Sequence, residues 1–527
     1  MTTISTSAAR QLAGQLIMIR FPGTVLDADT RDFIRANSIR AVCLFRGNML
    51  DAVQLSQLTR DLREAMGEDA LIAIDQEGGA VVRATWLPAP PAALALGAAD
   101  DVALAREVGA AVARGVKSLG FNWNFAPVLD LNNNLNNPVI AERSFGLDPQ
   151  RASELALAWM QGSLDEGVAC CVKHAPGHGD THVDSHRDLP TVDKPLAALQ
   201  ALEFTPFKLA SPHAPAMMTA HIVYPALDAE LPATLSPRIL TGLIRDEWQF
   251  DGVVITDGMD MHAIAGRYGV GQAAVQSLLA GTDMVMALGN RETQQATLAA
   301  LTECIASGAI SNEKLQQKLE RLRALAQRYP LPDTDIPASA QLQTYSSAQE
   351  QQDRELMRRA WQAALTAYGQ PVPPAPGSAI RVVVKKDASS DGVSEAGLSA
   401  QKLQAWLATH FDVALSTFES QEDLIWSELP QDGRRVILAS TSRIRYGAHA
   451  CQSWKPDLHL CLWNPFQALD IAAPALVTYG FAEPALQALG EWFHGRRQAS
   501  GRNPCLPDRR LFCLINHKNA PVCRERM

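Results

Sequence analysis

Short, almost wholly apolar segments alternate with helical patterns through residues 16–328, and this alternation limits the fold more than any other feature. Strands that are apolar throughout, rather than at every second position, are typical of parallel strands covered on both faces. Eight such units predict a (β/α)8 TIM-type barrel with long loops, and a doubly wound open sheet is the alternative. The eight predicted strands are Leu16–Phe21, Arg40–Phe45, Leu71–Asp75, Asn122–Leu129, Val168–His174, Ala216–Ile222, Gly252–Asp257 and Asp283–Leu288.

Helices are predicted between several of these strands. Asp101–Ser118 ends just before a strand, and Ser236-Pro237 supplies an N-cap and a first-turn proline for a helix that runs through Trp248. Asn312–Arg328 carries leucines at helical spacing and closes the barrel region.

The chain has 527 residues, too many for one core, and proline-bearing breaks mark its division. We expect a catalytic barrel over residues 1–335, a linker with a helix over 336–378, and a smaller three-layer α/β domain over 379–527. In the last region strands are predicted at residues 380–384, 435–439, 458–463 and 475–479, helices at 399–409 and 483–493, and irregular chain from 496 onward. The helix of the linker is expected at residues 346–368.

Composition excludes several classes of partner. The net charge is −9, which argues against nucleic acid, and no apolar run approaches the length of a membrane span. The nine cysteines are irregularly spaced, and residues 1–20 contain no apolar core of a signal peptide. The expected location is therefore the cytoplasm, without nucleic-acid or membrane partners; the oligomeric state is not indicated.

One loop concentrates groups that exchange protons near neutral pH. Residues 173–186 read Lys-His-Ala-Pro-Gly-His-Gly-Asp-Thr-His-Val-Asp-Ser-His and hold four of the twelve histidines. Histidines at every fourth position would form a metal-binding face on a helix, but the proline and glycines of this stretch disfavour a helix. We interpret it as a proton-handling loop that follows a strand.

Polar side chains also mark the carboxyl ends of other predicted strands, where barrel enzymes place their catalytic groups. Asp257 at such an end is placed like a carboxylate nucleophile. Asp184 stands two residues before His186 and can orient it as a general acid/base. The remaining charged groups suit a polyhydroxylated ligand: Asp75, Arg83, Asp130, Arg143, Lys173 and His174. A nucleophilic carboxylate, a separate proton donor and such hydroxyl-binding groups together indicate retaining glycoside hydrolysis.

These motifs resemble those of the bacterial β-N-acetylglucosaminidases (β-hexosaminidases of the cell-wall recycling type) in glycoside hydrolase family 3. The similarity rests on Lys173–His186 with Asp188-Leu189-Pro190, and on further motifs in the same order: Asp75–Gly79 with Arg83, Ala126–Asp130, Asn137–Ile140, Arg143–Gly146, Met218–His221 and Ile255–Met261. It covers the first region, whereas the second region is similar to the family only loosely.

The resemblance implies an exo-acting, retaining enzyme that removes terminal β-linked N-acetylglucosamine. By it, Asp257 is the nucleophile, His186 the acid/base and Asp184 its partner, while Asp75, Arg83, Asp130, Arg143, Lys173 and His174 bind the terminal sugar. The implied substrate is an N-acetylglucosaminyl-anhydro-muramyl (muropeptide) fragment of peptidoglycan recycling, with no cofactor and no metal.

Alternatives remain at this point. An imidazole acid/base repels phosphate less than a carboxylate does, so a β-N-acetylglucosaminide phosphorylase is one variant. A family 3 β-glucosidase or β-xylosidase is another. A metal-dependent hydrolase using the histidine loop and a catalytically silent carbohydrate-binding relative are the readings from other classes.

Overall fold

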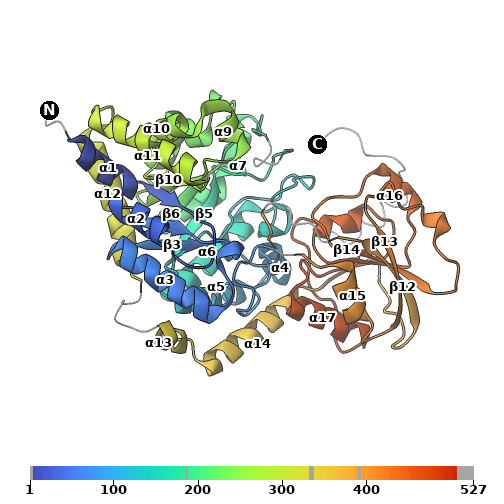
Figure 1. Cartoon of the computed structure of the whole chain (residues 1–527). Coiled ribbons are helices and arrows are strands. Elements are labelled where there is room, and N and C mark those ends of the chain that lie inside the picture. Colours follow the sequence, from blue (N-terminus) through green and yellow to red (C-terminus); the bar gives the residue numbers. More distant parts are fainter. Residues whose placement is uncertain (1–3, 184–187, 332–337, 388–392, 396, 507–527) are drawn as a thin grey trace.

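The computed structural model describes residues 4–183, 188–331, 338–387, 393–395 and 397–506. It has two bodies, a barrel surrounded by helices and a smaller open sheet, joined along one side by a long helix (Figure 1). Among the described residues, every helix is too short or too polar to cross a bilayer.

The first body is a closed barrel of eight parallel strands, which confirms the TIM-type prediction over the open sheet. Each predicted strand occurs, six of the eight shorter than expected, and β1 closes the barrel by pairing with β10. The strands, in chain order, are β1 (Ile17–Ile19), β2 (Ala41–Cys43), β3 (Leu71–Ile74), β4 (Trp123–Asn124), β5 (Ala169–Ala175), β6 (Ala216–Thr219), β9 (Val253–Gly258) and β10 (Met284–Ala287).

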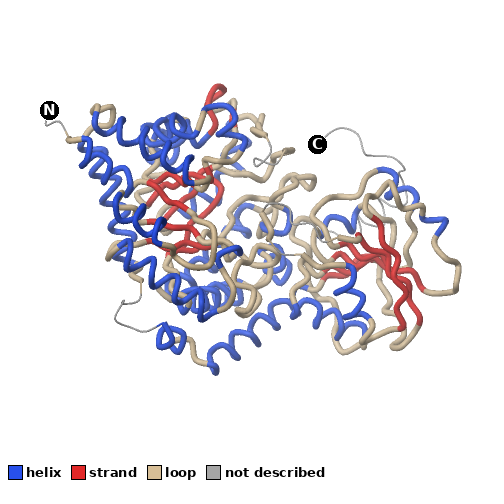
Figure 2. The backbone as a smooth tube through the Cα atoms, in the orientation of Figure 1, coloured by secondary structure: helices blue, strands red, loops and turns tan. Residues whose placement is uncertain are grey.

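Helices surround this barrel, and the red strands of Figure 2 lie inside a ring of blue helices. They are α1 (Thr6–Gln15), α2 (Ala28–Ala36), α3 (Ala52–Met66), α4 (Ala93–Ala99), α5 (Val102–Ser118), α6 (Pro149–Asp165), α7 (Leu196–Ala201), α8 (Phe204–Ala210), η4 (Arg238–Glu247), α9 (His262–Tyr268), α10 (Val270–Ala280), α11 (Arg291–Ala306) and α12 (Asn312–Arg328). Apart from Asp257 in β9, the barrel strands are buried along their length, as their apolar composition requires.

The three predicted barrel helices are confirmed, with one change in geometry. α5 is capped by Asp101, whose side chain accepts a hydrogen bond from the backbone of Leu104. η4 begins after Ser236-Pro237 but is a π-helix rather than an α-helix. A small hairpin that the sequence did not indicate, β7 (Val223–Tyr224) with β8 (Asp228–Pro232), lies in the loop after β6.

The second body is a six-stranded sheet in the order β11-β16-β15-β14-β12-β13. β11 is antiparallel to its neighbour, and the other strands are parallel. Its elements are β11 (Thr366–Tyr368), β12 (Ala379–Lys385), α15 (Ala400–Leu407), β13 (Asp412–Phe418), β14 (Arg435–Ser440), α16 (Ala448–Ser453), β15 (Leu458–Cys461), β16 (Ala475–Val477) and α17 (Glu483–Phe493).

The long linking helix is α14 (Ser347–Ala364), preceded by the short α13 (Ala338–Gln343). The sequence predicted that this helix continues to Tyr368, but it ends four residues earlier and the chain enters β11. The second sheet therefore begins inside the segment predicted as a linker. The reason is local: the backbone of Leu365 leaves the helical region, and Thr366 has the β-branched side chain that favours a strand.

The faces of the second sheet have different neighbours. One face packs on α15 and α17 through residues such as Val382, Leu403 and Leu489. The opposite face, near β15 and β16, shares a cluster of buried side chains with α14 and with α4 of the barrel. Both bodies thus contribute to one apolar core at their interface, which positions the second domain beside the mouth of the barrel.

Candidate active site

A cavity of about 190 Å³ opens at the carboxyl ends of the barrel strands. Asp75 directly follows β3, Lys173 and His174 belong to the end of β5, and Asp257 belongs to the end of β9. All four line the cavity. Drug-sized ligands occupy pockets of roughly 300–1,000 Å³, so this smaller cavity suits a single sugar ring.

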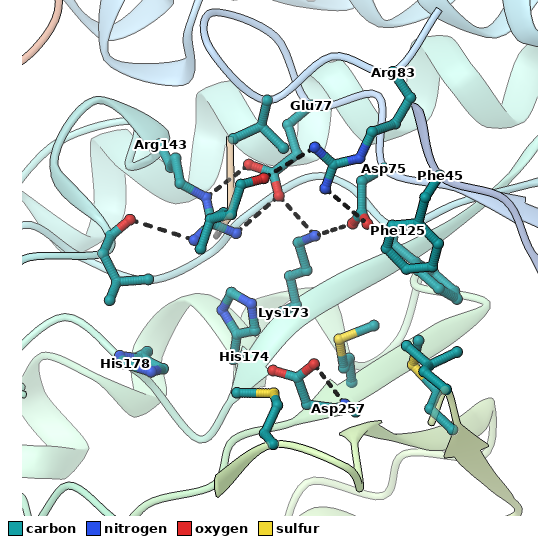
Figure 3. A pocket seen from close by; sticks show the side chains of 18 of the residues that line it. Phe45, Asp75, Glu77, Arg83, Phe125, Arg143, Lys173, His174, His178 and Asp257 are labelled. Carbon is teal, nitrogen blue, oxygen red and sulfur yellow. Dashed lines mark hydrogen bonds and ion pairs between the residues drawn. The ribbon is translucent and has the colours of Figure 1, made fainter. Parts of the chain in front are cut away.

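A buried network of alternating charges forms one wall (Figure 3). The guanidinium of Arg143 donates two hydrogen bonds to Glu77, at 2.8 and 2.9 Å. The ammonium of Lys173 lies 2.7 Å from a carboxylate oxygen of Glu77 and 2.7 Å from one of Asp75. Because each charge has partners, the wall presents fixed donors and acceptors to a ligand.

Protonation in this network is held in one state. Burial alone would raise the pKa of Glu77, but the charges of Arg143 and Lys173 hold it well below the usual range. Burial likewise opposes the charge on Lys173, and its carboxylate neighbours nonetheless raise its pKa. Both groups therefore stay ionised at neutral pH and serve as hydrogen-bonding partners, not as proton donors to a leaving group.

Asp130 supports the neighbouring wall from behind. It is 1% exposed, and its carboxylate lies 2.7 Å from Nδ1 of His174 and accepts a 2.6 Å hydrogen bond from the backbone of His178. Burial would raise the pKa of Asp130, but the charge and hydrogen bond of His174 lower it. Asp130 thus fixes the orientation of the His174 ring, whose other edge lines the cavity.

Arg83 lies at the edge of the charged wall, and its guanidinium is buried. It donates a 2.9 Å hydrogen bond to the backbone carbonyl of Val393, and its distance to Asp75 is 3.5 Å. Val393 belongs to the second domain, and its side chain also lines the cavity. The site therefore includes a contribution from beyond the barrel, which the sequence did not indicate.

Asp257 lies across the cavity from the charged wall (Figure 3). Its side chain is half-buried, and one carboxylate oxygen accepts a 2.7 Å hydrogen bond from the backbone N–H of Gly258. Behind it, His221 is buried, with Nε2 2.9 Å from the carbonyl oxygen of Gly258 and Nδ1 2.8 Å from the hydroxyl of Thr234. Asp257 thus projects from a strand end that neighbouring side chains hold in place.

The loop after β5 is described as far as Val183 and again from Asp188. Asp184 and His186 lie outside the described residues, so their approach to Asp257 stays a prediction. The described part is anchored to the barrel: Asp180 pairs with Lys194 at 2.7 Å, and an Asn137 amide donates to the carbonyls of His178 and Gly179. The anchored loop passes beside the cavity, since His178 is one of the lining residues.

Sequence reasoning missed several lining groups. Glu77 was not among the predicted sugar-binding residues, yet it borders the cavity and binds both Arg143 and Lys173. The apolar part of the lining was not predicted: Phe45, Val81, Phe125, Val139, Met218, Met261, Met286, Leu288 and Val393. Apolar residues at strand ends resemble core residues in sequence, so only the folded arrangement distinguishes them.

Metal binding was one of the alternatives drawn from the histidine loop. Within the ranges that the structure describes, His, Cys, Asp and Glu form no group of three or more suited to holding a metal ion. His174 is oriented by Asp130, and His178 lies 3.0 Å from the hydroxyl of Thr181, so these two imidazoles have protein partners.

A closed parallel barrel with ionised side chains gathered at the carboxyl ends of its strands defines a TIM-barrel enzyme. Residues 9–325 match the family model described as the glycosyl hydrolase family 3 N-terminal domain. The chain belongs to glycosyl hydrolase family 3 and is a glycoside hydrolase.

Named relatives agree with this assignment. The chain is 34% identical over 337 residues to a protein named beta-hexosaminidase A from Pseudoalteromonas piscicida. The aligned region covers 58% of this chain and 56% of that protein. It is 35% identical over 290 residues to a beta-hexosaminidase from Alkalilimnicola ehrlichii, covering 54% of this chain and 83% of the relative.

A solved structure resembles both domains. The structure of a glycoside hydrolase family 3 beta-N-acetylglucosaminidase from Paenibacillus sp. str. FPU-7 has a TM-score of 0.84 and 33% identity, covering 94% of this chain and 98% of that one. A beta-glucoside phosphorylase has a TM-score of 0.78 at 21% identity, which shows a shared fold alone.

Proposed function

We propose that this protein is a retaining exo-β-N-acetylglucosaminidase that removes terminal β-linked N-acetylglucosamine. The observation that supports this most is the layout of the cavity, which is sized for one sugar ring between a wall of ionised hydrogen-bonding groups and the carboxylate of Asp257. The names of the relatives, beta-hexosaminidase and beta-N-acetylglucosaminidase, support the choice of sugar.

In the proposed reaction, a carboxylate oxygen of Asp257 attacks the anomeric carbon and forms a covalent glycosyl-enzyme. The bond to the leaving oxygen breaks, and that oxygen takes a proton from His186, which Asp184 orients. Water then attacks the anomeric carbon, gives its proton to His186 and releases Asp257. Two displacements retain the β configuration.

The charged wall would bind the hydroxyl groups of the terminal sugar. Asp75 and Glu77 are carboxylate acceptors, Lys173 and Arg83 are donors, and His174 presents the ring edge that Asp130 does not hold. Charge-assisted hydrogen bonds of this kind are about twice as strong as neutral ones, which favours a hydroxyl-rich ring over an apolar one.

The natural substrate that we propose is an N-acetylglucosaminyl-anhydro-muramyl fragment, processed in the cytoplasm during peptidoglycan recycling. The resemblance of the sequence motifs supports the anhydro-muramyl part of this substrate as the leaving group. A test is to incubate the protein with purified muropeptides and with N-acetylglucosamine oligomers at equal concentration, and to compare kcat/KM. A higher value for the oligomers would contradict the muropeptide proposal while leaving the chemistry intact.

The chemistry itself is tested with aryl glycosides. The protein is expected to release phenol from an aryl β-N-acetylglucosaminide, and to act much more slowly on the matched β-glucoside and β-xyloside. NMR of the first product distinguishes retention from inversion. Failure to turn over the β-N-acetylglucosaminide, or faster turnover of the β-glucoside, would contradict the proposal.

The same assay identifies the acceptor. With water as acceptor the product is free N-acetylglucosamine whether or not phosphate is present, whereas a phosphorylase forms N-acetylglucosamine 1-phosphate. Hydrolysis is the proposed outcome, and a phosphate-dependent rate with a sugar phosphate as the main product would replace it with the phosphorylase alternative.

A further inference from the structure

The segment Val393–Glu395 of the second domain contacts the sugar cavity of the barrel. The side chain of Val393 lines the cavity, and its backbone carbonyl accepts a 2.9 Å hydrogen bond from Arg83. Within the barrel, Nη2 of Arg83 lies 3.5 Å from a carboxylate oxygen of Asp75, and its guanidinium carbon lies 5.8 Å from the centre of the Phe45 ring. The second domain therefore supplies the shorter polar contact of this guanidinium.

Glu395 strengthens the same attachment. One of its carboxylate oxygens lies 3.1 Å from Nε of Arg83 and accepts a 3.0 Å hydrogen bond from the backbone of Arg46. Arg46 follows β2 and Arg83 follows β3, so one carboxylate from the second domain joins two barrel loops. The side chain of Glu395 is 29% exposed, and that of Arg83 is 5% exposed.

A second connection lies deeper between the domains. Arg443 donates a 2.7 Å hydrogen bond to Glu142, which also accepts one from the indole of Trp463 at 2.8 Å. The side chains of Arg443 and Glu142 are 2% and 1% exposed. Glu142 immediately precedes Arg143, the residue whose guanidinium holds Glu77 in the cavity wall.

The two connections meet at Ser394. The same Nη2 of Arg443 that binds Glu142 donates to the hydroxyl of Ser394 at 3.0 Å, and Ser394 lies between Val393 and Glu395. One guanidinium thus fixes both the segment that contacts Arg83 and the turn that carries Arg143. Protein partners hold these arginines in position before a ligand binds, so binding does not have to reorganise them.

We propose that the second domain completes the sugar-binding site, with Glu395 and Arg443 as positioning residues for Arg83 and Arg143. The identity of the sugar in this inference rests on the proposed function, whereas the contacts between the two domains do not depend on it. Because Arg83 and Arg143 would hold the non-reacting part of the sugar equally before and during the reaction, their misplacement is expected to raise KM and to leave kcat nearly unchanged.

Glu395 is the residue to change first, because its partial exposure makes a folded variant attainable. For Glu395→Ala we expect KM for an aryl β-N-acetylglucosaminide to rise about tenfold, the size expected for one charge-assisted contact. Glu395→Gln should recover part of this loss, since an amide oxygen still accepts from Arg46. An unchanged KM in Glu395→Ala would overturn the proposal.

Arg445 provides a matched control. It lies two residues from Arg443 and also crosses the interface, donating to the carbonyl of Leu135 at 3.1 Å and pairing with Asp470. None of these partners lines the cavity. Arg443→Gln should raise KM and Arg445→Gln should not, whatever the melting temperatures of the two variants are. An equal rise in both would mean general loosening of the interface and would overturn a specific role.

Hydrogen–deuterium exchange separates this inference from the proposed function. In Glu395→Ala, amide exchange at residues 76–84 should become faster than in the unaltered protein, whatever substrate the enzyme uses. If turnover of the aryl glycoside fails but exchange rises as expected, the proposed function is wrong and the positioning role stands. Unchanged exchange at residues 76–84 would overturn the positioning role.

Discussion

Asp257 is the residue on which the proposed displacement depends, since it is the carboxylate that faces the charged wall across the cavity. Asp257→Asn replaces the nucleophilic carboxylate with a neutral amide but preserves the size of the side chain. We expect kcat to fall by at least about 10³-fold with little change in melting temperature. Steady-state kinetics on an aryl β-N-acetylglucosaminide, with circular dichroism on the same samples, checks this.

The matched control is Asp251→Asn, a like change just before the same strand. The side chain of Asp251 is 96% exposed and its partner, Arg321, is 3.4 Å away at the surface. Exposed ion pairs of this type contribute little to stability, so the activity of Asp251→Asn should remain within about twofold of the original. Retention of more than a tenth of the activity by Asp257→Asn would show that another group is the nucleophile.

His178 gives the protein a pH dependence that is independent of catalysis. Burial, followed by the nearby charge of His174, lowers the pKa of His178 from 6.5 to about 4. In this window the unfolded chain binds a proton that the folded chain does not, so stability falls as the pH is lowered from 6.5 toward 4. The slope from this one group is about 1.4 kcal/mol per pH unit.

The test compares the unaltered protein with His178→Gln, which keeps a polar group near Thr181. Melting temperatures measured between pH 4 and 8 should converge as the pH falls from 6.5 to 4, because the variant has no imidazole to protonate. Asp130 and His174 are unchanged in the variant, and the backbone N–H at position 178 that donates to Asp130 is kept. Parallel curves would contradict a buried, neutral His178.

At the scale of elements, the loop after β5 depends on close backbone packing at Gly179. A Cβ at this position would lie 1.7 Å from the carbonyl oxygen of Leu131, a contact that only a backbone shift can relieve. We expect Gly179→Ala to destabilise the protein by about 2 kcal/mol and to reduce activity, because the same loop continues to Asp184 and His186. Chemical denaturation and turnover measured together check this.

Gly242→Ala is the control for this substitution. Gly242 is exposed on η4, and its nearest neighbour to an added Cβ is the carbonyl oxygen of Pro237 at 4.0 Å. Alanine favours helical backbone over glycine by about 1 kcal/mol, so this variant should be as stable as the original or slightly more so. Equal losses in both variants would contradict the packing argument.

In the second sheet, the strands that the sequence predicted and those that it missed differ in position. The central strands of the second sheet, including β12 and β14, have continuous apolar runs and were predicted. The two strands of that sheet that were missed, β11 and β13, are its two edges. An edge strand needs no apolar side chain on every position, so β13 is mostly half-buried and lacks a recognisable pattern.

At the scale of the whole molecule, the two domains share a core and are expected to unfold together. Trp361 of α14 is 1% exposed, belongs to the same apolar cluster as Leu94 and Tyr479, and donates a 3.0 Å hydrogen bond to the carbonyl of Ala89. Differential scanning calorimetry should therefore show one main transition, and two well-separated transitions would contradict this coupling.

Trp361→Ala should strongly lower the temperature of that transition. The expected loss of unfolding free energy is about 3–5 kcal/mol, because the substitution empties a large volume between the domains. Trp406 is the comparison: it is half-buried on α15 and packs against Phe493 inside the second domain, with ring centroids 6.1 Å apart. Trp406→Ala should reduce the free energy of unfolding by a smaller amount. A smaller effect at Trp361 than at Trp406 would place the main core away from the interface.

The sequence by itself determined the barrel and the residues at its strand ends, because apolar runs and strand termini are local patterns that parallel β/α units translate directly into three dimensions. It placed Asp75, Lys173, His174 and Asp257 correctly at such ends. Its assignment of Asp184 and His186 as the proton-transfer pair rests on their spacing and stays a prediction.

Only the tertiary structure decided which charges meet. Glu77 joins Arg143 and Lys173, and Glu395 reaches Arg83, through contacts between residues 66 to more than 300 positions apart in the chain. No local pattern encodes such a pairing, because it depends on how helices and loops from both domains pack. The family was therefore readable from short motifs, whereas the walls of the site arose from long-range packing.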